Sequence, residues 1–221
     1  MHTFPTPTAI TTVLDIPAGR VQLIAADRTD TTVQVQPADP DKNRDVKAAQ
    51  QTTVTYDDGV LRVQAPPAKN QAFGPSGSVE ITVQLPTGSH LQATAASAGL
   101  RGVGRLGRVA FEAARGPVKL DEAASAHLTL QDGDVTLGRL GGPAQVSTAR
   151  GDIVIAHATQ GTVEVRTESG DITVSAAPGV SAALDAGTPH GRVHNALKND
   201  GETTLDIRAT TSHGDITARS L

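Results

Sequence analysis

Glycine recurs at a near-constant interval through the second half of the chain, and this spacing limits the folds available to it. The glycines that share one place in the pattern are Gly99, Gly116, Gly133, Gly151, Gly170, Gly191 and Gly214. Successive members are 17 to 23 residues apart. An internal period of this length is typical of repeat proteins, in which each repeat buries its apolar face against its neighbours. We therefore expect a chain that winds in stacked units.

Apolar residues two positions apart follow these glycines, as in GDVTL, GDIVI and GDITV. A second series of turns falls half a period later, at Gly107, Ala126, Gly142, Gly161 and Gly201. Alternation with period two predicts strands whose apolar side chains point to one side. Two strands and two turns then make one two-faced coil of about 18–19 residues.

The pattern predicts an all-β fold with a β-solenoid in the C-terminal half, residues 96–221. A β-rich N-terminal region, residues 1–95, is expected to pack on the solenoid or to continue it. The core column of the solenoid is predicted to be Val135, Leu137, Ile153, Ile155, Ile172, Val174, Val163 and Val165. An antiparallel sandwich is the alternative, since it also has strands every 8 to 12 residues. The near-identical GD repeats at full-coil spacing favour the solenoid.

In the N-terminal region, short alternating runs predict further strands. These are Ile10–Leu14, Arg20–Ile24, Thr32–Gln36, Thr52–Tyr56, Val60–Val63 and Val79–Leu85. The polar stretch from Asp39 is expected to hold one or two helical turns, and the Pro/Gly-rich segment from Ala65 is expected to be a loop or lid.

A column of turn residues is predicted at the corners of the coils. Its members are Gly116, Gly133, Gly151, Gly170, Gly191, Gly214, Asp134, Asp152, Asp171 and Asp215. Glycine suits a corner that needs a positive φ. The aspartates have two interpretations: a calcium ladder, because hard cations take oxygen ligands, or acceptors for turn backbone N–H groups. The calcium-binding GGxGxD signature is absent, which favours hydrogen bonding.

Composition excludes several classes of function. The chain has no cysteine, so it has neither disulfides nor Cys-ligated metals. A net charge of -4 with interspersed signs gives no field for collecting phosphates, so nucleic acid is not an expected partner. Only 2% of the residues are aromatic, which suits a thin aliphatic core. No signal peptide or membrane span is recognisable, and we expect a cytoplasmic location.

The GD repeats at Gly133, Gly151, Gly170 and Gly214, preceded by DDGVLRV and VEITVQLP, resemble a known family. They are similar to the bacterial β-strand-repeat domains of unknown function called putative adhesins. The resemblance covers nearly the whole chain, and its motifs are short and structural. It implies a repetitive β-helical fold, a surface or envelope-stress role in some members, and no established enzymatic activity. It supplies no catalytic residues.

Other motifs predict no catalytic, cofactor or metal site. His190, His194 and His213 are zinc-ligand types, but no further ligand has a matching spacing, so we interpret them as solvated turn histidines. Gly102, Gly104 and Gly107 spell a dinucleotide fingerprint without the helix that it needs. Neither GxSxG nor HExxH occurs. Residues expected to form an interaction surface are Arg101, Arg105, Arg108, His190 and His213.

The leading functional hypothesis is a non-catalytic scaffold or adhesin-like interaction module. Its partner is another protein or a second copy, bound through the C-terminal end of the solenoid, because the last repeat, HGDITARSL, runs to the C-terminus without a capping coil. One alternative is a carbohydrate-active enzyme using Asp152, Asp171, Glu168 and Arg166. Another is a self-assembling, cytoskeleton-like element.

Overall fold

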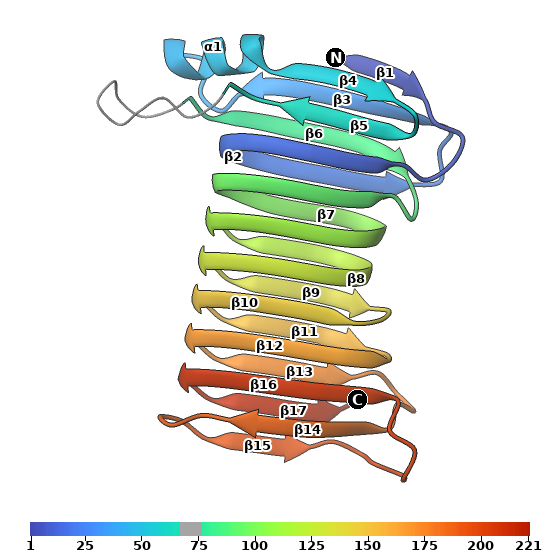
Figure 1. Ribbon diagram of the computed structural model, residues 1–221, viewed down its shortest axis with the longest axis vertical. Coiled ribbons are helices and arrows are strands. Elements are labelled where there is room, and N and C mark those ends of the chain that lie inside the picture. Colours follow the sequence, from blue (N-terminus) through green and yellow to red (C-terminus); the bar gives the residue numbers. More distant parts are fainter. Residues whose placement is uncertain (67–76) are drawn as a thin grey trace. The chain divides into compact units, whose positions relative to one another are not determined.

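Figure 1 shows the computed structural model of the chain, which describes residues 1–66 and 77–221. The chain divides into two compact units, Met1–Gly116 and Pro117–Leu221. The loop or lid expected from Ala65 falls largely on residues 67–76, outside the described residues. Strands dominate both units, and the predicted all-β solenoid is confirmed.

The first unit contains a single described helix, α1, which covers Asn43–Gln51. Its strands are β1 His2–Pro5, β2 Thr11–Ala26, β3 Asp30–Pro37, β4 Thr53–Asp57, β5 Val60–Gln64, β6 Val79–Pro86 and β7 His90–Arg115. Each of the six runs predicted as strands overlaps one of the strands β2 to β6, and two of the runs fall on β2. The polar stretch from Asp39 forms α1, whose buried Asp45 accepts a hydrogen bond from the backbone N–H of Ser78 at 2.9 Å, just before β6.

Coil winding begins in the first unit, at β2. The first half of β2 pairs in parallel with β5 and β7, and the second half pairs in parallel with β6 and β7. The strand changes face near Gly19, which has a φ of 139° and where an added Cβ would clash with the carbonyl oxygen of Val79. Antiparallel pairs β1 with β3, β3 with β6 and β4 with β5 complete this unit.

The second unit is built of parallel strands on two faces. They are β8 Val118–Asp132, β9 Val135–Leu140, β10 Ala144–Arg150, β11 Ile153–Ala158, β12 Gly161–Ser169, β13 Ile172–Ala176, β14 Ala182–Gly187, β15 Val193–Ala196, β16 Leu205–His213 and β17 Ile216–Ser220. One face has the order β8, β10, β12, β16, β14. The other has the order β8, β9, β11, β13, β17, β15, because the two halves of β8 belong to different faces.

The apolar side chains between the two faces are stacked in register. Val135 pairs with Ile153, and Ile153 pairs with Ile172. On the opposite face, Val163 lies between Ala144 and Ile207. All eight residues of the predicted core column are at most 1% exposed. Each coil therefore contributes one layer to a continuous aliphatic interior. Stacking against neighbouring coils buries the apolar side chains that a single coil would expose to water.

The last repeat in sequence is not the last coil in space. Strands β16 and β17, which we call the inserted coil, lie between the β12–β13 coil and the β14–β15 coil (Figure 1). The expectation that HGDITARSL forms the open end is therefore wrong, because β17 has a neighbour on each side. The end of this unit is the β14–β15 coil, residues 182–196, which we call the end coil.

Side-chain polarity explains this order. The interior residues of the inserted coil are Leu205, Ile207, Ala209, Ile216 and Ala218, each at most 1% exposed. The equivalent residues of the end coil include Val193, which is 45% exposed, and Asn195, which pairs with Ala218. An asparagine side chain in the stacked interior would lose its hydrogen bonds to water and find no hydrogen-bond partner among the aliphatic side chains, which is unfavourable. The more apolar repeat therefore occupies the inner place, and the repeat that carries Asn195 lies at the end.

One buried hydroxyl in the first unit gives a test of packing. The Oγ1 atom of Thr12 is buried and has no hydrogen-bond partner within the described part of the chain. We predict that Thr12→Val raises the free energy of unfolding by about 1 kcal/mol, since valine keeps the shape and removes an unpaired polar group. Urea denaturation followed by circular dichroism measures the change.

The matched control is Thr31→Val. The hydroxyls of Thr31 and Thr6 form a buried hydrogen bond of 2.8 Å. Removing one of them leaves the other unpaired and lowers the free energy of unfolding by about 1–3 kcal/mol. Equal losses in both variants would show that Thr12 has a partner in solution.

Candidate functional site

The corners of the second unit form one continuous ladder of glycines. Gly133, Gly151, Gly170 and Gly214 have φ between 136° and 155°, in the region that favours glycine. Each glycine stacks on the next, so a Cβ added at Gly170 would clash with the carbonyl oxygen of Gly151. Gly191 of the end coil stacks in the same way on Gly214. Gly116, in the first unit, stacks on Ala98.

The predicted aspartates connect neighbouring coils at these corners. Oδ1 of Asp134 accepts a hydrogen bond from the backbone N–H of Asp152 at 2.9 Å. The same bond joins Asp152 to Asp171 and Asp171 to Asp215, each at 2.8 Å. Each carboxylate thus accepts a backbone hydrogen bond from the next coil rather than from its own turn. This leaves Oδ1 of every bridging aspartate engaged with protein.

The ladder ends at a charged pair. Asp215 accepts hydrogen bonds at 2.9 Å from both the backbone N–H and the guanidinium of Arg192, in the end coil. The backbone N–H is the larger cause, and the guanidinium the next, of a lowered pKa of the Asp215 carboxyl. Because this pKa is lower in the folded state, the ionised carboxylate stabilises the fold at pH values above the pKa of the unfolded state. This stabilisation is lost as the pH falls through the pKa of the folded state. Arg192 replaces the aspartate of the other repeats, so the chain of acceptors stops there.

A row of threonines at the corner also ties the coils together, and sequence reasoning missed it. The hydroxyl of Thr167 donates to the carbonyl oxygen of Gly151 at 3.1 Å, and that of Thr211 donates to Gly170 at 3.0 Å. Thr188 donates to Gly214 at 3.0 Å, which repeats the bond in the end coil. The signal was present, because threonine stands three residues before the corner glycine in TESGD, TSHGD and TPHGR.

The expected interaction surface falls into two separate places. Arg101, Arg105 and Arg108 lie on β7 in the first unit, where the backbone N–H of Arg108 donates to Nδ1 of His90 at 2.9 Å. The GxGxxG glycines also lie within β7, so a strand stands where a nucleotide fingerprint needs a helix. His190 and His213 lie at adjacent corners of the second unit, paired by an isolated β-bridge.

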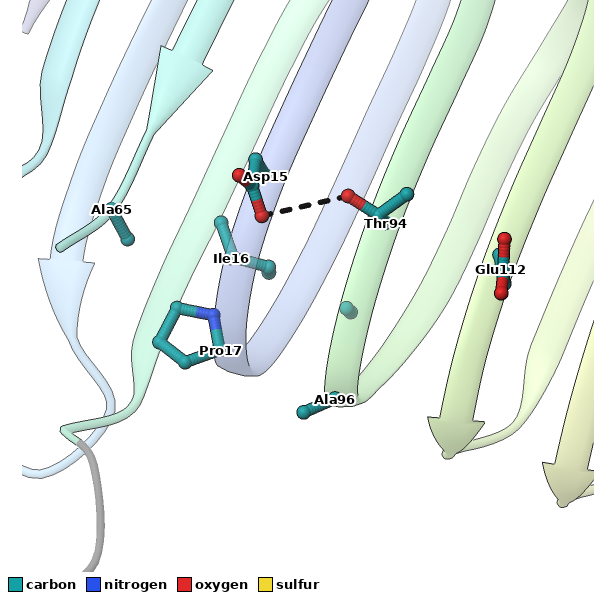
Figure 2. A pocket seen from close by; sticks show the side chains of 8 residues that line it. Asp15, Ile16, Pro17, Ala65, Thr94, Ala96 and Glu112 are labelled. Atoms are coloured by element: carbon teal, nitrogen blue, oxygen red, sulfur yellow. Dashed lines mark hydrogen bonds between the residues drawn. The ribbon is translucent and has the colours of Figure 1, made fainter. Parts of the chain in front are cut away.

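The bend of β2 carries a hollow that the sequence did not indicate (Figure 2). Its volume is about 400 Å³, and it is lined by Asp15, Ile16, Pro17, Ala65, Thr94, Ala95, Ala96 and Glu112. The register of β2 with β7 brings Asp15 beside Thr94, whose hydroxyl makes a long hydrogen bond of 3.5 Å to the carboxylate. No motif predicts this meeting, because the two residues are 79 positions apart.

A second hollow, of about 430 Å³, is lined by Gly179, Ser181, Asp200, Glu202 and Thr204. Neither hollow is lined by Asp152, Asp171, Glu168 or Arg166, the residues considered for carbohydrate chemistry. Arg166 and Glu168 project into solvent from β12. Among residues 1–66 and 77–221, no three His, Asp or Glu side chains are arranged to hold a metal ion. The same residues contain no helix long and apolar enough to cross a membrane.

Stacked coils with a glycine, aspartate and threonine ladder at one corner define a β-solenoid of the repeat class. Residues 11–219 match the family described as Toastrack DUF4097, so the chain belongs to this family. The family resemblance inferred from the GD repeats is thereby confirmed. No curated protein matches the chain.

Several solved structures are similar to the chain at low identity. A putative adhesin from Bacteroides fragilis is 13% identical, with a TM-score of 0.48 over 98% of this chain and 95% of that one. A putative cell adhesion protein from Clostridium sporogenes is 13% identical, with a TM-score of 0.43 over 100% and 98%. A putative lipid binding protein from Parabacteroides distasonis is 15% identical, with a TM-score of 0.46 over 97% and 95%.

The glycine ladder predicts a large difference between two glycine-to-alanine variants. Gly170→Ala places a Cβ against the backbone of the neighbouring coil at a φ of 152°, and we expect it to lower the free energy of unfolding by about 2 kcal/mol or more. Gly187→Ala is the control, because an added Cβ there has nothing within 4 Å. Thermal unfolding of both variants measures the difference, and an equally small effect would contradict close stacking at the corner.

Proposed function

We propose that the protein is a non-catalytic scaffold that binds a protein partner by strand addition at the end coil. The end coil offers strand edges that are largely unpaired: within the described residues, β14 pairs with β16 alone and β15 pairs with β17 alone, and on the outer edge of β14 the N–H of Ala182 donates to the carbonyl oxygen of Lys198 at 3.0 Å. Unpaired N–H and C=O groups along an edge are the groups that another chain uses to extend a sheet. The proposal rests on this edge, and the family membership is compatible with it.

The end coil also presents apolar surface, which supports the same proposal. Val193 is 45% exposed, whereas the residue that it stacks on, Ile216, is 1% exposed. All four residues of β15 are exposed, and Leu184 of β14 is partly exposed. A partner strand would therefore gain both main-chain hydrogen bonds and contact with an open aliphatic interior.

A second copy of the chain is the partner that we expect first. The same open edge on two molecules gives an isologous contact, in which one patch meets its own copy about a twofold axis. Arg192 is already paired with Asp215 at 2.9 Å, so this guanidinium is neutralised and does not oppose such a contact. The cytoplasmic location expected from the sequence remains a proposal, which fractionation of native cells would test.

Light scattering on the full chain tests this proposal. We expect the wild-type chain to form a dimer as its concentration rises and Val193→Lys to shift the population to monomer, because an edge lysine opposes strand pairing. The matched control is Val154→Lys, on the outward side of β11, which should dimerise like the wild type. Circular dichroism confirms that each variant keeps its fold.

A wild-type chain that stays monomeric at all concentrations would overturn self-association. Strand addition by a different protein is then tested by cross-linking in native extract, with wild type and Val193→Lys compared. Recovery of the same proteins in equal amounts by both would overturn the role of the end coil.

A further inference from the structure

Two histidines meet at the boundary between the end coil and the inserted coil. The β-bridge that pairs His190 with His213 places their imidazole rings 4.8 Å apart, centroid to centroid, with 14° between the ring planes. Both residues are exposed. The equivalent corner positions of the other coils hold Ser169, Arg150 and Asp132. The pair is thus particular to this boundary.

The nitrogens of the two rings are free to bind a ligand. Within residues 1–66 and 77–221, neither side chain takes part in a hydrogen bond or an ion pair, and the two rings contact each other by stacking. A neutral imidazole carries a lone pair in the ring plane, which is a ligand for Zn²⁺, Cu²⁺ and Ni²⁺. Two such rings at adjacent corners act as a chelating pair: once an ion binds one imidazole, the other is held close to it at a high effective concentration.

We propose that His190 and His213 form a two-histidine site for a first-row transition-metal ion such as Zn²⁺. Rotations of some tens of degrees about χ1 and χ2 turn the stacked rings so that one nitrogen of each points at a shared ion, and such rotations are open to these exposed side chains because χ2 of histidine is broad. Since these residues belong to no cluster of three protein ligands within the described ranges, the remaining coordination positions are taken by water or by an outside donor. The site is open, as ligand-exchanging sites are, rather than closed like a structural zinc site.

The ion would fasten the end coil to the inserted coil. Side-chain hydrogen bonds already cross this boundary near the corner, from Thr188 to Gly214 and from Arg192 to Asp215. A metal bound by one histidine from each coil adds a further link beside them. Metal binding should therefore slow local opening of residues 182–196, the same coil whose edge is proposed above to bind a partner. The metal site itself does not depend on that proposed function.

Zinc titration by calorimetry tests the proposal on the tag-free full chain. Every protein carries His2→Ala, so that the exposed imidazole of His2 offers no other site for the metal. We expect one equivalent of Zn²⁺ to bind, and His190→Ala or His213→Ala to weaken binding by at least about tenfold. The matched control is His194→Ala, also in the end coil but paired with Thr217, which should leave the affinity unchanged.

A second readout separates metal ligation from a general effect on folding. Electron paramagnetic resonance of the Cu²⁺ complex should show two imidazole nitrogens, and one in each single variant. Hydrogen exchange of residues 182–196 should slow on addition of Zn²⁺. No zinc binding, or equal weakening by His194→Ala, would overturn the proposal. Repeating these measurements in the Val193→Lys background, which is expected to be monomeric, makes their outcome independent of the dimer predicted by light scattering.

Discussion

Close contact between backbones at one corner is the constraint on which the second unit depends. At this corner the glycines of successive coils stack so tightly that a Cβ would meet a carbonyl oxygen. Aspartate and threonine side chains then bond each corner to the next, through Asp152 to the N–H of Asp171 and through Thr167 to the carbonyl oxygen of Gly151. These bonds fix the vertical register of the coils. The aliphatic interior supplies the larger driving force, but it does not by itself decide which residue lies above which.

The same corner explains how a repeat can occupy a place out of sequence order. Asp171 bonds to Asp215, 44 residues later, in the same way that Asp152 bonds to Asp171, 19 residues later. The corner of the end coil has the equivalent glycine, Gly191, but it carries Arg192 in place of the aspartate acceptor. The ladder therefore favours the GD repeat in the inner place, and interior polarity, which places Asn195 at the end, favours the same order.

Much of this architecture was predictable because it rests on local, repeated signals. Val135, Ile153 and Ile172 share one position after GD, and this spacing alone places them in one interior row. The inserted coil was not predictable from spacing, because TPHGRV and TSHGDI carry nearly the same corner residues. The threonine row is present as a pattern in the sequence, but the many other threonines on the strands make it hard to single out. The hollow at Asp15 and Thr94 depends on a long-range register that no short motif encodes.

The order of the last coils can be measured directly, because the chain has no native cysteine. In the structure Thr173 pairs with Thr217, and Thr217 pairs with His194. A chain carrying Thr173→Cys and Thr217→Cys should form a disulfide on mild oxidation, since paired residues on adjacent strands lie within disulfide range. Thr173→Cys with His194→Cys should not, because the inserted coil separates them. A disulfide in the second variant and none in the first would contradict the inserted coil and restore a solenoid stacked in sequence order.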